Sequence, residues 1–307
     1  MIKSVNITNY LGDSVTYRID GVNVENNNGL IITDIEGLGP AKANLNFTKI
    51  ATYDGQIYNS AILDGRNIII HAKFTWARTI EEARLATYKF FPIKKQVQFV
   101  ITTDKRVATT WGYVESNAPE IFSDSDEVPG MTISVMCESS TFLDARGMNQ
   151  QMFSDVEPMF EFVYQNLSLS PVTEMSTFQS RRICHVNYEG DSESGFRMIV
   201  HAIGEVRNLT IYNVRTGEYV HIDTNKLAQK TGSGLKEGDD IILVSKPGEK
   251  SAKLLRNGDY TNVLIVLGKD PNWFSLAHGD NRFAYIADYG EENVRIYIEV
   301  QPLYDGV

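Results

Sequence analysis

The stretch from Asp34 to Phe47, DIEGLGPAKANLNF, has the spacing closest to that of a phosphate-binding loop. A dinucleotide-binding loop needs G-x-G-x-x-G at a strand-to-helix turn, so that backbone N–H groups face the pyrophosphate. Gly37 and Gly39 fit the first two positions, but Lys42 occupies the third, and Pro40 has no N–H to donate. A Gly-Lys-Ser/Thr segment is also absent. Because the following NLNF alternates polar and apolar residues, the stretch predicts a turn and a strand rather than a nucleotide site.

The titratable residues lack the spacing of a metal or catalytic site. The five histidines are dispersed, without the H-E-x-x-H or H-x-H spacing that would hold a zinc ion. No G-x-S-x-G nucleophile motif occurs, and no acidic run matches a calcium loop. A glycosidase needs two carboxylates facing each other across a sugar, an arrangement that the sequence leaves open. The sequence therefore predicts no enzyme, no catalytic residue, no cofactor and no metal ion.

Charge and composition exclude further classes of protein. The chain has 307 residues and a net charge of −10, whereas proteins that bind nucleic acid need a basic surface, so direct binding of DNA or RNA is not expected. The two cysteines, Cys137 and Cys184, have no C-x-x-C spacing and are expected to be buried thiols. No apolar run reaches the ~20 residues of a membrane helix, and the first fourteen residues contain no apolar segment typical of a secretory signal. We expect synthesis in a cytoplasm and no membrane partner.

Strand patterns dominate, and they predict a mainly β protein. Segments rich in β-branched and aromatic residues predict strands over 67–76, 96–104 and 131–142. One helix is predicted after Thr79, which forms a capping box with Glu82, and Pro92 follows its end. A second series of strands is predicted from residue 196 onward, in FRMIVHAIGEV, LTIYNV, YVHID, DIILVS, AKLLRN, FAYIAD and VRIYIEV.

The pattern predicts two domains. Between 148 and 177 polar residues, prolines and irregular apolar positions replace the regular alternation. We therefore predict a first β domain over 1–147, a linker region over 148–177 and a second β domain over 178–307. Regularly spaced strands with intervening turns in the second domain are typical of an antiparallel sandwich or barrel.

Aromatic residues give an alternative function. Trp273, Phe274 and Tyr285 are near one another in the sequence, and together they would form a platform on which a sugar stacks. A carbohydrate-binding β-sandwich therefore stays open as a second hypothesis. Aromatic residues are also common in strands for packing reasons alone.

The order of features resembles the family of phage distal tail proteins, the siphovirus-type tail component. In its N-terminal domain the resemblance rests on GLIITDIEGLGPAKANLNFTKIATYDGQIYNSAILDGRNIIIHAKF, the capped helix, TTWGYVES and GMTISVMCESSTF. In its C-terminal domain it rests on GLKEGDDIILVSKPGEKSAKLLRNGDYTNVL and residues 273–307, with the Gly279–Asn281 turn and the closing YDGV. The resemblance covers both ends and most of the chain, through turns and strands rather than catalytic motifs.

The resemblance implies a structural role in a virion. It implies an N-terminal β-sandwich with a single α-helix and a projecting hairpin, and a galectin-like or OB-like C-terminal β-sandwich. It further implies a ring, usually of six subunits, at the tip of a phage tail. The implied partners are the tail tube protein, the tail-associated hub or lysin, and receptor-binding or baseplate proteins. Leu38 and Pro40 form an apolar pair on a turn, where solvent would favour polar residues, and are predicted to lie at a subunit contact. The full set of candidate interface residues is Leu38, Pro40, Tyr53, Tyr58, Trp273, Phe274 and Tyr285.

Overall fold

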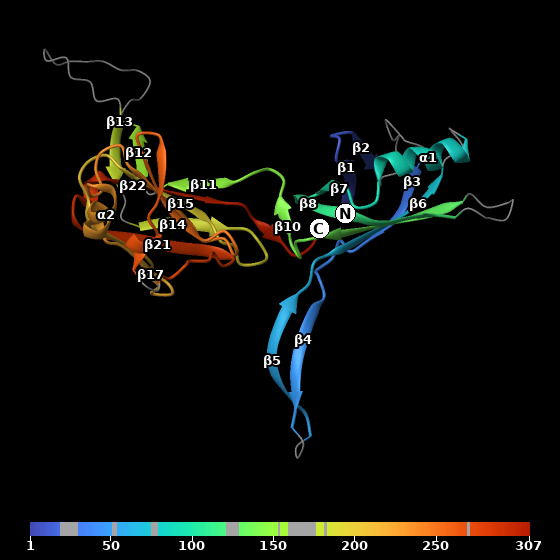
Figure 1. Cartoon of the computed structure of the whole chain (residues 1–307), viewed down its shortest axis with the longest axis horizontal. Coiled ribbons are helices and arrows are strands. Elements are labelled where there is room, and N and C mark those ends of the chain that lie inside the picture. Colours follow the sequence, from blue (N-terminus) through green and yellow to red (C-terminus); the bar gives the residue numbers. More distant parts are fainter. Residues whose placement is uncertain are drawn as a thin grey trace, which may run out of the picture. The chain divides into compact units, whose positions relative to one another are not determined.

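The protein is mainly β, as the sequence predicts (Figure 1). The computed structural model describes residues 1–18, 30–50, 54–74, 79–120, 129–152, 154–158, 176–180, 183–268 and 271–307. The chain divides into two compact units. Met1–Gly147 and Leu303–Val307 make up the first, and Met148–Pro302 make up the second. The structure differs from the predicted domain organisation at the C-terminus. The last five residues belong to the first unit and not to the second.

Nine strands of the first unit form one sheet, in the order β2-β1-β7-β8-β9-β6-β3, with β10 paired to β8 and to β23. The elements of this unit are β1 (Ile2–Thr8), β2 (Ser14–Arg18), β3 (Leu30–Glu36), β4 (Ala43–Lys49), β5 (Gln56–Leu63), β6 (Asn67–Phe74), α1 (Ile80–Phe90), β7 (Gln96–Thr103), β8 (Val107–Pro119), β9 (Gly130–Cys137), β10 (Phe142–Asp144) and β23 (Leu303–Tyr304). All of the pairings are antiparallel.

Strict alternation places the core of the first unit on one face of this sheet. In β7, Val97, Phe99 and Ile101 are buried while the residues between them are partly exposed. The pattern follows from the period of two along a strand. Helix α1 covers part of the core with Ala83 and Phe90. Two free thiols were predicted to be buried, and Cys137 belongs to this core, while Cys184 lies in that of the second unit.

Helix α1 begins and ends where the sequence predicts. The Thr79 side chain accepts a hydrogen bond from the backbone N–H of Glu82 at 3.3 Å, which satisfies one N–H of the first turn. At the other end, the Asn117 side chain from β8 donates to the backbone oxygens of Thr87 and Phe91. These contacts attach the end of the helix to the sheet.

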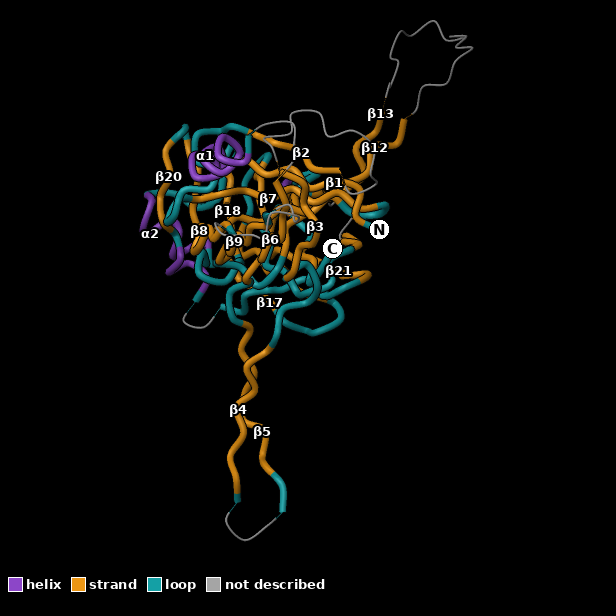
Figure 2. Tube along the Cα trace, turned by 90° about the vertical axis from the view of Figure 1, so that its right-hand side faces the viewer, coloured by secondary structure: helices purple, strands orange, loops and turns teal. Residues whose placement is uncertain are grey.

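Strands β4 and β5 pair only with each other and form a two-stranded hairpin. Figure 2 shows the two strands twisted about each other along their length. The β4 strand begins just after the Gly37–Pro40 turn, as the alternation in NLNF predicts. This pair corresponds to the projecting hairpin that the resemblance implies.

The second unit contains two packed sheets, with strand orders β11-β22-β15-β18-β19-β20 and β14-β21-β16-β17, and a separate β12–β13 pair. Its elements are β11 (Asn149–Met152), β12 (Ser154–Pro158), β13 (Ser176–Ser180), β14 (Ile183–Tyr188), β15 (Arg197–Ala202), β16 (Arg207–Asn213), β17 (Tyr219–Ile222), α2 (Thr224–Thr231), β18 (Asp240–Val244), β19 (Ser251–Arg256), β20 (Asp259–Asn262), η1 (Leu264–Leu267), β21 (Gly279–Tyr289), η2 (Glu291–Asn293) and β22 (Val294–Val300). Strand β11 lies within the predicted linker, yet it pairs with β22.

Helix α2 is an element that the sequence analysis missed. Its signals are present: the Asp223 carboxylate accepts hydrogen bonds from the N–H groups of Asn225 and Lys226, and Gly232 ends the helix with φ of 83°. An aspartate before a helix and a glycine after it are ordinary start and stop signals. The alternation in YVHID led to a strand prediction whose last residue is the helix cap.

Aromatic packing fixes the core of the second unit, and it gives a stability prediction. The Phe283 ring lies 5.5 Å from the rings of Phe196 and Phe274, edge-on to both. We expect Phe283→Ala to lower the free energy of unfolding of this unit by about 3–5 kcal/mol, through lost burial and an internal cavity. Urea denaturation followed by intrinsic fluorescence measures it. Tyr289→Ala, at an exposed position, is the matched control, and equal losses for both variants would contradict the assignment.

Candidate assembly interface

The β4–β5 hairpin exposes many large apolar side chains. Every residue of β5 is exposed, and so are six of the seven residues of β4. The exposed large apolar residues of the hairpin are Leu45, Phe47, Ile50, Ile57, Tyr58, Ile62 and Leu63. A single two-stranded hairpin is marginally stable in water, and exposed apolar patches of this kind mark interaction sites. The hairpin is therefore the best candidate for an interface in the described part of the chain.

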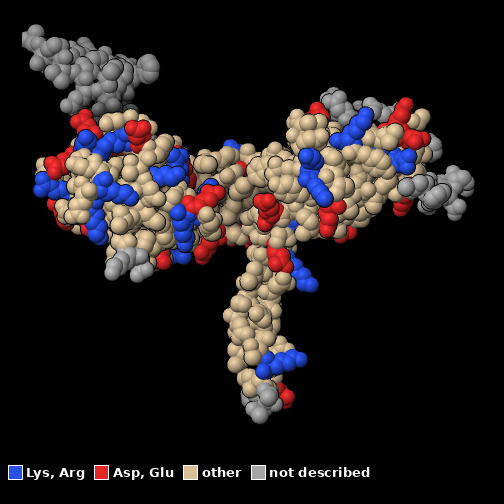
Figure 3. Space-filling model, viewed as in Figure 1, with Lys and Arg blue, Asp and Glu red and all other residues tan. Residues whose placement is uncertain are grey.

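Charge is absent from most of the hairpin. Residues 43–48 and 56–63 contain no Lys, Arg, Asp or Glu. In Figure 3 this part of the hairpin is tan, the colour of uncharged residues, and blue and red atoms lie near its two ends. The Phe47 and Tyr58 rings, 5.9 Å apart and edge-on, pack across the pair of strands. Because residues 43–48 and 56–63 carry no ion, burying this part of the hairpin avoids the cost of an unpaired charge, provided that its amide and hydroxyl groups find hydrogen-bond partners.

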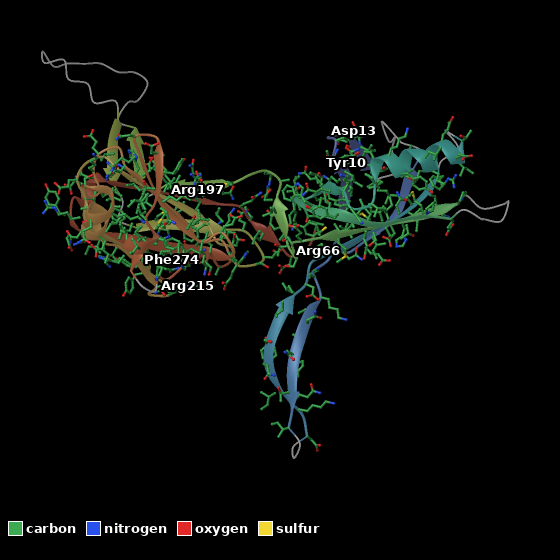
Figure 4. The ribbon with its side chains drawn as sticks, in the orientation of Figure 1. Tyr10, Asp13, Arg66, Arg197, Arg215 and Phe274 are labelled. Carbon is green, nitrogen blue, oxygen red and sulfur yellow. The ribbon has the colours of Figure 1, made fainter. Side chains whose placement is uncertain are left out.

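A buried arginine holds the base of the hairpin (Figure 4). Arg66, which is 3% exposed, follows β5 by three residues. Its Nη1 donates hydrogen bonds to the backbone oxygens of Gly37 and Gly39, and its Nη2 donates to those of Ser140 at 2.7 Å and Asp305 at 2.6 Å. The guanidinium also lies 4.1 Å from the centre of the Phe142 ring. One side chain thus connects the turn before β4, the residues after β5, the segment before β10 and the end of the chain.

Burial has an electrostatic effect on the Arg66 side chain. It removes water from the guanidinium and thereby lowers the pKa of Arg66, while nearby Cys137 and Asp305 act in the opposite direction. Arginine stays protonated even so, because a guanidinium does not lose its proton in a protein. The positive charge is stabilised by the four carbonyl oxygens, and removing the side chain would leave those acceptors without this donor.

Two glycines at the hairpin base, Gly37 and Gly65, allow backbone segments to approach each other closely. Gly37 belongs to the stretch whose spacing is closest to that of a phosphate-binding loop, so packing explains this glycine without a nucleotide. Gly37 has φ of 83°, and a Cβ there would lie 2.0 Å from the Asn67 backbone oxygen. At Gly65 a Cβ would lie 2.5 Å from the Cys137 backbone oxygen. The glycines therefore allow close backbone contact between neighbouring segments. A hollow of about 300 Å³ beside them is lined by Pro40, Lys42 and Arg66, among others, but the turn leads into a strand and has no helix N-terminus.

Leu38 and Pro40 occupy different environments. Leu38 is 7% exposed and belongs to the core of the first unit, so the argument that placed it at a subunit contact does not hold. Its backbone oxygen accepts a hydrogen bond from the N–H of Val307. Pro40 is exposed at the base of the hairpin, and its predicted place at a subunit contact stays a prediction.

The segment after Pro302 is held against the first unit by a polar cluster. The Tyr304 hydroxyl donates to Asp144 Oδ2 at 2.8 Å, and Arg146 Nη2 donates to the same oxygen at 2.8 Å. Arg106 lies over the Tyr304 ring and donates to the Gly306 backbone oxygen. Burial of Asp144 opposes ionisation, but the hydrogen bonds from Arg146 and Tyr304 outweigh it and lower the pKa of Asp144.

The remaining predicted interface residues have divergent outcomes. Tyr58 is exposed on β5, and its predicted place at a contact stays a prediction, whereas Tyr53 lies outside the described residues. Phe274 and Tyr285 are buried in the core of the second unit and offer no surface to a partner or a sugar. Trp273 packs partly against that core, beside a hollow lined by Lys230, Lys250 and Leu264, among others.

Within the described residues, no group of three or more His, Cys, Asp or Glu side chains is arranged to hold a metal ion. None of the described helices has the length and apolar character needed to cross a membrane.

Comparison with solved structures identifies the fold. The chain is similar to the crystal structure of the Dit protein of phage SPP1, with a TM-score of 0.60 and 10% sequence identity, over 97% of this chain and 98% of that chain. That protein is described as a paradigm of the hub adsorption apparatus in phages that infect Gram-positive bacteria. The chain thus has the fold of a phage Dit protein, which confirms the predicted fold.

Two baseplate structures are also similar. The baseplate of phage P2 in its activated conformation with Ca gives a TM-score of 0.46 at 10% identity, over 100% of both chains. The corresponding phage p2 structure with Sr gives 0.42 at 10% identity, over 97% of both chains. Neither protein-family models nor curated proteins match this sequence.

The hairpin base gives a prediction about Arg66. We expect Arg66→Met to lower the free energy of unfolding of the first unit by about 2–4 kcal/mol, because four backbone carbonyl groups lose a charged donor. Hydrogen exchange should become faster at the Gly37–Pro40 turn and in residues 303–307. Lys89→Met, on the exposed side of α1, is the control. Unchanged exchange in both segments would show that Arg66 does not hold them.

Asp144 gives a prediction about pH. A carboxyl whose folded pKa is lowered stabilises the fold above its unfolded pKa of about 3.9, and that stabilisation is lost as the pH falls through the folded value. We expect Asp144→Asn to destabilise the first unit by about 1–3 kcal/mol at pH 7, with a smaller difference from the natural protein at pH 3. Urea titrations at both pH values measure this. Asp54→Asn, at an exposed position, should have no comparable effect, and a pH-independent loss in Asp144→Asn would contradict the explanation.

Proposed function

We propose that this protein is a structural component of a phage tail tip, where copies of it form a closed ring that joins the tail tube to the baseplate hub. The observation that carries the proposal is the match to the SPP1 Dit fold over nearly the whole of both chains. The exposed apolar hairpin supports it, because a surface of this kind needs a protein partner.

The hairpin makes the contact between subunits. A ring built from identical chains uses heterologous contacts, in which one surface of each copy meets a different surface of the next. An apolar hairpin that its own chain leaves exposed is suited to one side of such a contact. Pro40, exposed at the hairpin base, belongs to the same side.

The wider assembly is proposed from the resemblance. The ring contains six copies and contacts the tail tube protein on one side and the hub or tail-associated lysin on the other. The second unit carries receptor-binding or baseplate proteins. The chain is made in the cytoplasm of the bacterial host, and it has no catalytic activity of its own. Incubation with host cell-wall material, followed by analysis of released fragments, tests the last point, since turnover would overturn it.

Carbohydrate binding is the less favoured function. Of the three aromatic residues proposed as a platform, Phe274 and Tyr285 are buried in the core of the second unit. A stacking platform needs exposed ring faces, so the feature that suggested sugar binding is missing. The fold comparison also favours a tail-tip component.

Assembly is tested by substitution on the hairpin. We expect the natural protein to form rings, visible by negative-stain electron microscopy alone or with tail tube protein. Tyr58→Asp introduces a charge into the contact and should weaken self-association by about 30-fold or more, as for a central interface residue. Light scattering coupled to size exclusion measures the mass over a concentration series.

Leu85→Asp, which alters an exposed apolar residue of α1, is the matched control and should assemble normally. Circular dichroism checks that both variants fold. Compact monomers of the natural protein at every concentration, even with tube protein, would contradict the proposal. Equal assembly of natural protein and Tyr58→Asp would instead place the subunit contact elsewhere.

A further inference from the structure

Five residues that follow the second unit in the sequence belong to the first unit. We define this return segment as Leu303–Val307. Its strand β23 pairs with β10, where Leu303 lies opposite Leu143 and Tyr304 opposite Phe142, and the mark C in Figure 1 lies beside β10. The residues after β23 contact the turn that precedes β4. The return segment therefore connects β10 with the base of the hairpin.

Tyr304 fills a position in the core of the first unit. Its side chain is 2% exposed and belongs to the same core cluster as Phe142. The hydroxyl donates a hydrogen bond to the carboxylate of Asp144, which is 3% exposed. A first unit without the return segment therefore has a vacant core position beside a buried carboxylate, and that carboxylate has one donor fewer.

The other residues of the return segment hold the turn at the hairpin base. The Val307 N–H donates to the Leu38 backbone oxygen at 3.1 Å, and the Asp305 backbone oxygen accepts from Arg66 Nη2 at 2.6 Å. At Gly306 a Cβ would lie only 3.2 Å from the Leu38 oxygen, so the two backbones are in direct contact. Arg66 and Asp305 are 239 positions apart, so the base of the hairpin depends on residues that are made long after it.

Translation separates these parts of the first unit in time. Residues 1–147 are made first, and the ~155 residues of the second unit then take about 8–30 s at ~5–20 residues per second before the return segment follows. Single β domains fold in milliseconds to seconds, so most of the first unit has time to form during this interval. The contacts of the return segment cannot form in that time, because one partner of each contact does not yet exist.

Folding of the second unit brings the return segment to its site. In the antiparallel β11–β22 pair Asn149 is opposite Val300, and in the antiparallel β10–β23 pair Leu143 is opposite Leu303. Once β11 and β22 have paired, the loop that docking must close shrinks from ~160 to ~7 residues, which favours docking by on the order of 100-fold. A return segment attached to an unfolded second unit lacks this advantage.

We propose that docking of the return segment is the last folding step of the first unit, and that the base of the hairpin stays open until the second unit has been made and has folded. The return segment thereby couples the two units, because the hairpin is fixed in position only in a chain whose second unit is complete. Specific association needs a preorganised surface, so incomplete chains are kept out of assembly. The folding step concerns a single chain, and only its consequence for assembly rests on the proposed function.

Ribosome-bound chains test the order of events. The reporter is Leu38→Cys in a Cys137→Ala/Cys184→Ala background, which leaves one thiol, at the turn that the return segment contacts. One chain is arrested directly after Val307, with the return segment still in the exit tunnel. The other is arrested after an added flexible linker that brings the return segment outside. We expect a maleimide to label the thiol of the tunnel chain about 10-fold faster or more than that of the linker chain.

Two variants of the linker chain identify the cause of the protection. Tyr304→Asp leaves the second unit intact but puts a charge into the core of the first, and it should restore fast labelling. Tyr289→Asp, which puts the same charge at an exposed position of the second unit, is the matched control and should stay protected. Equal rates for the tunnel and linker chains, or protection of Tyr304→Asp, would overturn the inference.

Purified protein tests the coupling between the units without a ribosome or an added thiol. At a urea concentration that unfolds the second unit of Phe283→Ala but not that of the natural protein, we expect hydrogen exchange at residues 142–146 to become about 10-fold faster or more, while β7 stays protected. Tyr289→Ala is the control and should exchange like the natural protein. Unchanged exchange at residues 142–146 beside an unfolded second unit would also overturn the inference.

The outcomes separate the inference from the proposed function. Both measurements report on single chains and need no ring. The expected rates together with rings in the electron microscope support both. The expected rates without rings support the inference and contradict the proposed function, whereas rings from a protein in which the return segment does not protect the Leu38 position overturn the inference alone.

Discussion

The buried guanidinium of Arg66 is the interaction on which the arrangement of the first unit depends. Placing a charge in a protein interior is costly, and here four backbone carbonyls and an aromatic ring offset that cost. Those carbonyls belong to segments that are far apart in the sequence. Because the guanidinium is planar and rigid, each segment must occupy a fixed position to reach it. A lysine could not replace it, since an ammonium group has only three donors.

This arrangement divides the hairpin into a fixed base and an exposed length. At the base, Gly37 and Gly65 permit backbone contacts that any side chain would block. Beyond it, the two strands pair their backbones only with each other, and their side chains lack a core and, apart from Lys49, a charge. Stability is therefore concentrated where the hairpin leaves the sheet. Among the described residues the exposed part has little to pack against, which is the physical reason for proposing that it takes part in assembly.

Residues close together in the sequence were enough to predict helix α1 and most of the strands. The burial and contacts of the candidate interface residues depend instead on residues that are far apart in the sequence. The Thr79 cap fixed the start of α1, and alternation fixed most of the strands, because both depend on residues close in sequence. The burial of Leu38 depends on residues near 307, and the role of Arg66 depends on carbonyls up to 239 residues away, so neither has a local signature. Phe274 and Tyr285 were aromatic residues near each other, yet sequence alone does not distinguish a stacking platform from a core. Helix α2 was missed although its caps are readable.

The uncharged hairpin has a consequence for the chain before assembly. Both edges of a two-stranded ribbon expose unpaired N–H and C=O groups, and with apolar side chains this combination favours irregular aggregation. The net charge of −10 opposes such aggregation, because free copies repel one another over about a Debye length, ~8 Å at physiological salt. The net charge of the whole chain thus opposes aggregation, while the apolar hairpin supplies the surface that favours association.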